Sequence, residues 1–212
     1  MPTKGTLFAL LCVILAAPAP ARAQSLMDLL TKGPVVSVTE KEGRFENVLA
    51  VHHIRAPIET VWETCIDFER YPAIMPKVVS AEVQQVKPGV LDVRFEIEVP
   101  GVNPVYTNRY ELSKARWQIA ARWLKGDLKG SYNRWLLVPL QEDETLIYYT
   151  TASRNFNKMA QAFEDDQQTL TVGVNVSSAL AVVKGTKIEA ERRHAVAAKQ
   201  GVKAAAPAPP RE

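Results

Sequence analysis

The chain has 212 residues, of which 47% are hydrophobic and 23% charged, as in an ordinary soluble globular protein. Lys and Arg number 26 against 23 Asp and Glu, but the first 23 residues hold Lys4 and Arg22 and no acid. Subtracting these two leaves 24 basic against 23 acidic side chains. Because phosphate binding requires clustered, uncompensated basic residues, this balance excludes nucleic acid as the main partner. The length suits one domain with a sizeable core.

The N-terminus has the three parts of a secretory signal peptide. Lys4 gives a positive start, residues 7–17 form an apolar run, and Ala21-Arg22-Ala23 is a small-x-small cleavage site. A retained membrane anchor is the alternative, but the apolar run falls short of the about 20 residues that span a bilayer. We therefore expect residues 1–23 to be a signal peptide cut after Ala23, and the mature protein to be periplasmic or secreted.

Signal cleavage would remove Cys12 and leave Cys65 as the remaining cysteine. An intramolecular disulfide is then excluded. Cys65 lies on the apolar side of a predicted helix, and no basic residue adjoins it in the sequence. It is therefore interpreted as a packed small hydrophobe and not as a nucleophile.

Residues 57–66 predict an amphipathic helix. Pro57 suits its first position, and the residues that follow at helical spacing are apolar: Ile58, Val61, Trp62, Cys65 and Ile66. The polar residues between them fall on the opposite side: Glu59, Thr60, Glu63 and Thr64. A second short helical turn is expected before Pro76.

Strands are predicted on both sides of this helix. An N-terminal extension over 24–46 holds a possible extra strand at 35–40, and 45–55 leads into the helix. Six strands follow, at 78–86, 91–99, 106–112, 117–124, 131–140 and 145–154. Apolar and polar residues alternate strictly between Leu91 and Val99, which indicates one buried and one solvated face. The regular strand–turn spacing predicts an antiparallel, meandering sheet.

The last element is predicted to be one long helix over 166–194. Its first half, T-L-T-V-G-V-N-V, alternates like a strand, whereas its second half has helical spacing and ends in basic residues that suit a helix C-terminus. The Pro- and Ala-rich residues 196–212 are predicted to be a disordered tail. The folded domain is thus expected over 47–195.

Three stretches carry a family resemblance: A-P-I-E-T-V-W-E-T-C-I-D-F-E-R-Y-P-A-I-M-P, G-S-Y-N-R-W-L-L-V-P-L and T-L-I-Y-Y. With the element order, they resemble the START-like helix-grip fold of the SRPBCC superfamily. The nearest resemblance is to the polyketide cyclase/dehydrase and lipid-transport group, which includes coenzyme-Q-binding START domains, and it covers about 48–193. It implies an α+β fold: a curved antiparallel sheet wrapped around the long C-terminal helix, with two short helices after the first strand and a cavity for a hydrophobic ligand.

Candidate ligand-binding residues are the large side chains of the strands and one face of the last helix. From the pattern alone a filled core is favoured, because protein interiors pack without voids, but the resemblance reverses that preference. Arg122 and Arg134 alternate with tryptophans and are candidates to hold a ligand head group. The full candidate set is Phe95, Ile97, Tyr106, Tyr110, Trp117, Trp123, Arg122, Arg134, Trp135, Tyr148, Val174 and Ala181.

The favoured function is an exported carrier of a hydrophobic small molecule, either a lipid or an isoprenoid-like compound. One alternative is a cyclase- or dehydrase-like enzyme that folds a reactive chain in the same cavity around one Arg or Tyr acid/base, with Arg122 and Arg134 as candidate arginines. Another is an interaction domain with a filled core. No catalytic motif occurs, and His52 and His53 would point to opposite faces of a strand, so we expect no cofactor and no metal site. Transient membrane contact is left open, and the sequence indicates no protein partner.

Overall fold

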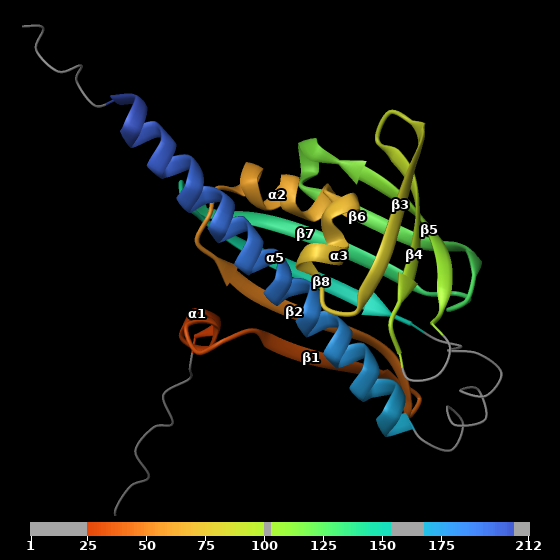
Figure 1. The fold of residues 1–212 in the computed structure, drawn as a ribbon. Coiled ribbons are helices and arrows are strands. Elements are labelled where there is room, and N and C mark those ends of the chain that lie inside the picture. The colour runs from red at the N-terminus through yellow and green to blue at the C-terminus, as the bar shows by residue number, and fades with distance from the viewer. Residues whose placement is uncertain (1–24, 100–102, 154–167, 206–212) are drawn as a thin grey trace, which may run out of the picture.

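The computed structural model describes residues 25–99, 103–153 and 168–205 (Figure 1). The strands are β1 (Val35–Lys41), β2 (Arg44–Ile54), β3 (Val78–Lys87), β4 (Val90–Ile97), β5 (Val105–Ser113), β6 (Gln118–Gly126), β7 (Tyr132–Gln141) and β8 (Glu144–Ala152). The helical elements are α1 (Leu26–Leu30), α2 (Ile58–Ile66), η1 (Phe68–Arg70), α3 (Tyr71–Ile74), η2 (Lys114–Arg116) and α5 (Gln168–Ala205).

The strands form an eight-stranded sheet in the order β1-β2-β8-β7-β6-β5-β4-β3, and each neighbouring pair is antiparallel. Six of the strands follow α3 as a meander, and β1 is the extra N-terminal strand. Helices α2, α3 and α5 lie on one face of the sheet, and α5 runs diagonally across it (Figure 1). The predicted α+β helix-grip fold is confirmed. Among the described helices none is both long and apolar enough to cross a membrane.

Helix α2 buries its predicted apolar stripe, with two differences at its edges. Pro57 is the N-cap residue in extended conformation, so the helix begins at Ile58 and not at Pro57. Thr64 is fully buried although its neighbours Thr60 and Glu63 are not, because its hydroxyl donates to the carbonyl of Thr60 at 2.8 Å. This internal hydrogen bond satisfies the hydroxyl and lets a threonine pack as an apolar residue.

Helix α5 is continuous, as predicted, and includes the strand-like stretch at its start. It has 38 residues, so it is roughly 57 Å long at 1.5 Å per residue. It extends to Ala205, beyond the predicted end at His194, so the disordered tail cannot begin at residue 196. The Ala and Lys residues there favour a helix, and the prolines that stop one come later in the sequence.

The hydrophobic core lies between the sheet and the helices on its face. Its largest fully buried members include Trp135 on β7, Phe68 on η1, Ile119 on β6 and Val61 on α2. Cys65 is also fully buried, and this desolvation raises the pKa of its thiol to about 12. The thiol is therefore protonated at neutral pH, in agreement with its interpretation as a packed small side chain.

Helix α5 comes closest to α3 at Gly185. A Cβ atom built there would lie 2.7 Å from the carbonyl oxygen of Ile74 and 2.8 Å from Sδ of Met75. These distances are shorter than van der Waals contact, so only glycine allows this approach. At Gly173, a little over three turns earlier on the same helix, a Cβ would meet nothing within 4 Å. The two glycines thus separate a tightly packed part of α5 from an open one.

We predict that Gly185→Ala and Gly173→Ala have opposite effects on stability. Gly185→Ala should lower the free energy of unfolding by about 1–3 kcal/mol, because the added methyl forces α5 away from α3. Gly173→Ala should leave it unchanged or raise it by up to about 1 kcal/mol through helix propensity. Urea denaturation of both variants measures this, and equal effects would contradict the difference in packing.

Candidate functional site

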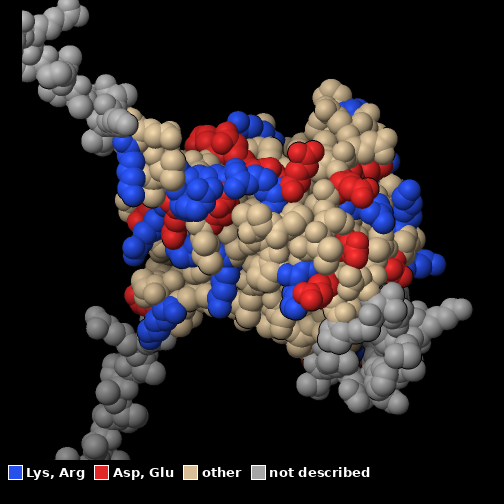
Figure 2. Space-filling model, in the orientation of Figure 1, with Lys and Arg blue, Asp and Glu red and all other residues tan. Residues whose placement is uncertain are grey.

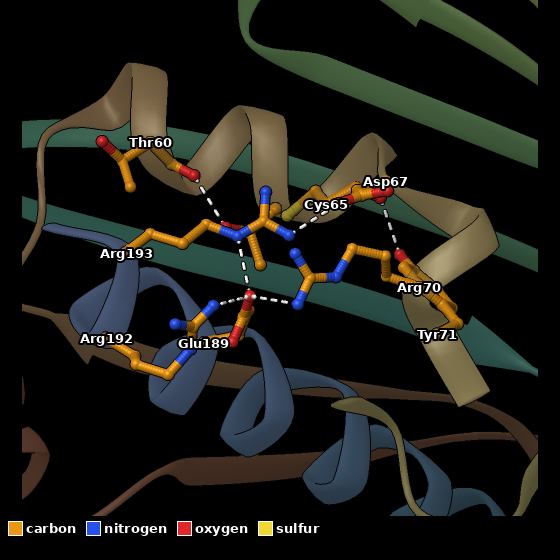
Figure 3. Close-up of polar contacts among 9 residues, drawn as sticks. Thr60, Cys65, Asp67, Arg70, Tyr71, Glu189, Arg192 and Arg193 are labelled. Atoms are coloured by element: carbon orange, nitrogen blue, oxygen red, sulfur yellow. Dashed lines mark hydrogen bonds and ion pairs between the residues drawn. The ribbon is translucent and has the colours of Figure 1, made fainter. Parts of the chain in front are cut away.

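A buried carboxylate, Glu189 on α5, is bound by arginines and ties the helix to the rest of the fold (Figure 3). Its oxygens accept from Arg192 at 2.7 and 2.8 Å and from Arg193 at 2.8 Å. Arg193 also donates to the Asp67 carboxylate, at 2.6 Å, just after α2, and Arg70 approaches Glu189 at 3.7 Å. We call Glu189, Arg192, Arg193, Asp67 and Arg70 the clamp. Asp67 is half-buried.

The clamp holds the C-terminal half of α5 against α2 and η1. The hydrogen bonds from Arg192, and then from Arg193, lower the pKa of Glu189 to about 2. Together with the close approach at Gly185, the clamp fixes the position of α5 over the sheet. The N-terminal half of the helix is attached differently, through Asn175, whose side chain bonds to both the N–H and the carbonyl of Ser153 at the end of β8.

A cavity of about 940 Å³ lies beneath this N-terminal half of α5. Residues of α5 from Thr171 to Val182 form one wall, and the inner faces of β4, β5, β7 and β8 form the other. The cavity is within the range of sites that hold drug-sized ligands. The space between sheet and helix is therefore open, and the filled core favoured by the pattern alone does not occur.

The walls of the cavity are strongly aromatic. Neighbouring rings contact one another along the sheet, with centroids 4.7 Å apart for Trp135–Tyr149 and 5.7 Å apart for Phe95–Tyr106. The aromatic lining residues are Tyr71, Phe95, Tyr106, Tyr110, Trp135 and Tyr149. Burial raises the pKa of each of the four tyrosines, so their hydroxyls remain neutral at physiological pH.

Polar side chains occupy part of the same wall. Asn133 Oδ1 accepts hydrogen bonds from the hydroxyls of Tyr149, at 2.9 Å, and Thr151, at 2.7 Å. Asn108, Ser131 and Trp135 also line the cavity, and each has a buried polar atom without a hydrogen-bond partner in the described part of the chain. The cavity thus combines apolar rings with a few polar groups, the usual make-up of a small-molecule site.

The charged residues of the lining, Lys77 and Asp127, are exposed and already paired. Lys77 Nζ lies 2.8 Å from Glu98, and the Asp127 carboxylate accepts from the backbone N–H of Val105 at 2.9 Å. On the face shown in Figure 2, basic and acidic side chains also lie next to one another. The deep part of the cavity, as described, is therefore free of formal charge.

Seven of the twelve candidate ligand-binding residues line the cavity: Phe95, Ile97, Tyr106, Tyr110, Trp135, Val174 and Ala181. The strand residues among them have their side chains on the face of the sheet that is turned toward α5. Ligand binding by these seven stays a prediction, although their position is suitable for it.

Five candidates lie outside the cavity lining. Arg122 and Arg134 are exposed on the outer face, with Arg122 3.9 Å from Glu111. Tyr148 also faces outward, where it packs with Leu146 and Val51, and its neighbour Tyr149 lines the cavity instead. The sequence predicted Tyr148 as the inward-facing residue of this pair, but Tyr149 is the one that faces the cavity.

The two tryptophans fail as candidates because the backbone around each is irregular. Trp117 has a left-handed conformation, with φ of 52°, and packs edge-on against Trp62 of α2 with centroids 5.7 Å apart. Trp123 adjoins a β-bulge between β5 and β6, and its indole N–H donates to the carbonyls of Gly126 and Asp127. Both are structural, and neither irregularity could be recognised in the sequence.

The adjacent histidines belong to the sheet and not to the cavity. His52 is buried on the inner face, where burial lowers its pKa to about 4, and His53 lies 3.3 Å from Glu144. Across the described ranges, no group of His, Cys, Asp and Glu is arranged to hold a metal ion.

Sequence reasoning missed the polar wall. Asn108 lies two residues from both Tyr106 and Tyr110, and Asn133 lies two residues from Trp135, so strand alternation already places both asparagines on the inner face. This alternation was sufficient to predict both asparagines, but the candidate set contains only apolar, aromatic and basic side chains.

A family model for polyketide cyclase/dehydrase and lipid-transport proteins matches residues 54–193, which is more than half of the chain. The chain belongs to this family. Its fold is the hydrophobic-ligand-binding fold shared by START proteins and polyketide cyclases. A comparison with curated proteins finds no match.

Solved structures share this fold at low sequence identity. The Zhui aromatase/cyclase from a Streptomyces species is 24% identical with a TM-score of 0.59, and the match covers 70% of this chain and 94% of that one. A STAR-related lipid transfer protein from Xanthomonas axonopodis is 16% identical, with a TM-score of 0.58 and coverage of 75% and 94%. A START superfamily protein from Mycobacterium smegmatis is 19% identical, with a TM-score of 0.51 and coverage of 71% and 98%. Structures that share this fold therefore include an aromatase/cyclase and a STAR-related lipid transfer protein.

We predict that Glu189 makes stability depend on acid pH. Its pKa is lowered on folding, so its contribution is complete above the ordinary value of 4.5 and is lost as the pH falls toward about 2. Glu189→Gln should lower the free energy of unfolding by about 1–3 kcal/mol at neutral pH. The difference from the unmodified protein should shrink steadily over this acid window. Urea denaturation across the window measures it.

Glu63→Gln is a matched control, because Glu63 is exposed on α2, away from the clamp. Its free energy of unfolding should equal that of the unmodified protein at every pH. The role of the clamp would be contradicted if Glu189→Gln did the same.

Proposed function

We propose that the protein binds a hydrophobic small molecule, a lipid or isoprenoid-like compound, and carries it in the periplasm or outside the cell. The observation that carries the proposal is the aromatic cavity of about 940 Å³ between the sheet and the N-terminal half of α5. Burial of a ligand there would release roughly 7 kcal/mol for each 300 Å² or so of apolar surface, before the costs of ordering. Binding would thus be driven by desolvation.

The side chains around the cavity favour binding over catalysis. The ionisable groups in its described lining are the paired Lys77 and Asp127 and four tyrosines that remain protonated. The cyclase alternative uses one Arg or Tyr as the acid/base. Arg122 and Arg134 are exposed on the outer face, whereas the tyrosines of the lining have raised pKa values. General acid–base catalysis needs a group that titrates near the working pH within reach of the substrate. None of the described lining residues meets this condition.

Export is the second part of the proposal and is supported by residues 1–23, which the structure does not describe. Release of the ligand would require α5 or a loop such as residues 100–104 to move, and residues 100–102 lie outside the described ranges. The exposed apolar side chains of Val99 and Val174, 40% and 37% exposed, lie at the cavity and provide a surface for transient membrane contact during loading.

Mass spectrometry of ligand extracted from the purified protein tests the proposal. The protein should retain a hydrophobic compound, and Ala181→Trp should reduce the retained amount at least about tenfold, because the indole occupies the cavity. Ile188→Trp is the matched control, since Ile188 is 70% exposed on the same helix, and it should retain the compound.

Two results would contradict the proposal. One is a protein that, when isolated from its own exporting cells, holds no hydrophobic compound and takes up none when incubated with a lipid extract. The other is an Ala181→Trp variant that melts at the same temperature as the unmodified protein and keeps the full amount of ligand. Recovery of the protein with its residues 1–23 still attached inside the cell would contradict the export part alone.

A further inference from the structure

Three buried polar atoms in the cavity wall have no hydrogen-bond partner in the described part of the protein. They are Oδ1 of Asn108, Oγ of Ser131 and Nε1 of Trp135. These residues are 1%, 3% and 2% exposed, and all three line the cavity. A buried polar atom without a partner costs on the order of 1–3 kcal/mol, so such atoms are rare unless something else binds them.

Asn108 and Ser131 are neighbours on the inner face of the sheet, whereas Trp135 lies further along it. Asn108 on β5 pairs with Trp123 on β6, whose backbone N–H donates to the carbonyl of Ser131 at 3.0 Å. Asn108 and Ser131 therefore lie on either side of one strand, with backbones about 10 Å apart. Trp135 follows Ser131 by four residues, so its backbone lies about 13 Å further along β7. This part of the cavity wall thus has an acceptor and a hydroxyl side by side.

We infer that the ligand carries a neutral oxygen group, a hydroxyl or a carbonyl, that is bound at this wall by Asn108 and Ser131. The inference rests on the proposed function and specifies the chemistry of the ligand at the same site. An amide oxygen accepts from a ligand hydroxyl, and a serine hydroxyl either donates to a ligand oxygen or accepts from a ligand hydroxyl.

A charged head group does not fit this wall. A carboxylate or phosphate placed beside Asn108 and Ser131 would be desolvated without a cation to pair with. Lys77 is the described basic residue of the lining, but it is exposed and its ammonium already contacts Glu98 at 2.8 Å. Fatty acids and phospholipids would have to leave their head groups outside, and the three polar atoms would then stay unpaired.

Four naphthalene compounds provide a direct test, because they share one apolar body and differ in a single group. They are naphthalene itself, naphthol with a hydroxyl, acetylnaphthalene with a carbonyl, and naphthoate with a carboxylate that is ionised at neutral pH. Binding of each to the delipidated chain is measured by equilibrium dialysis. Naphthol and acetylnaphthalene should bind at least about tenfold more tightly than naphthalene, the effect of one or two net hydrogen bonds. Naphthoate should bind no more tightly than naphthalene.

Variants test whether the preference for naphthol over naphthalene depends on Asn108 and Ser131. Ser131→Ala and, separately, Asn108→Leu should reduce the preference for naphthol over naphthalene, measured as the ratio of their Kd values, at least about threefold. Ser37→Ala, on the exposed part of β1, is the matched control and should preserve the preference. If Asn108→Leu does not fold, Ser131→Ala decides alone.

The outcomes separate this inference from the proposed function. If all four compounds bind equally, or if naphthoate binds most tightly, the inference is wrong but the hydrophobic cavity stands. Equal binding would mean that water satisfies the three atoms whether or not a ligand is present. If no compound binds, the proposed function fails, and the inference fails with it.

Discussion

The structure depends on the hydrogen bonds that two arginines of α5 make to the buried carboxylate of Glu189, one of which reaches on to Asp67. This contact sets the C-terminal half of α5 against α2, and the absence of a side chain at Gly185 lets the helix press against α3. A helix of 38 residues fixed in this way can cross the curved sheet as a rigid rod. Its other half then passes over the sheet without collapsing onto it.

The cavity lies where α5 is held over the sheet by the clamp and by the hydrogen bonds of Asn175 to Ser153. Where α5 is clamped, small and medium side chains such as Val183 and Ala190 are fully buried. Further toward its N-terminus the same helix presents Val174 and Ala181 to a space bounded by aromatic rings. Protein interiors normally close such spaces, since unmet dispersion contacts reduce stability. The space persists here because the backbone positions are set elsewhere, by ionic contacts and by the sheet. Such a space is the physical requirement for a carrier.

The sequence was sufficient for the fold and for much of the cavity, but not for its irregular parts. Strand alternation placed Phe95, Tyr106 and Trp135 correctly, because regular β-structure repeats every two residues. It failed at Tyr148, where either of two adjacent tyrosines could face inward, and at Trp117, where a left-handed residue breaks the alternation. The clamp joins residues that are 126 positions apart, and no local pattern indicates such a contact. Asn108 and Asn133 could have been predicted to face the cavity, because each lies two residues from an aromatic residue that does so.

A crystal structure of the protein, purified from its natural source without refolding, tests the central claim most directly. The account predicts continuous electron density, not attributable to the protein, inside the cavity and between Ala181 of α5 and Tyr110 of β5. The account would be contradicted if α5 were found closed onto the sheet, with the protein's own side chains occupying that space.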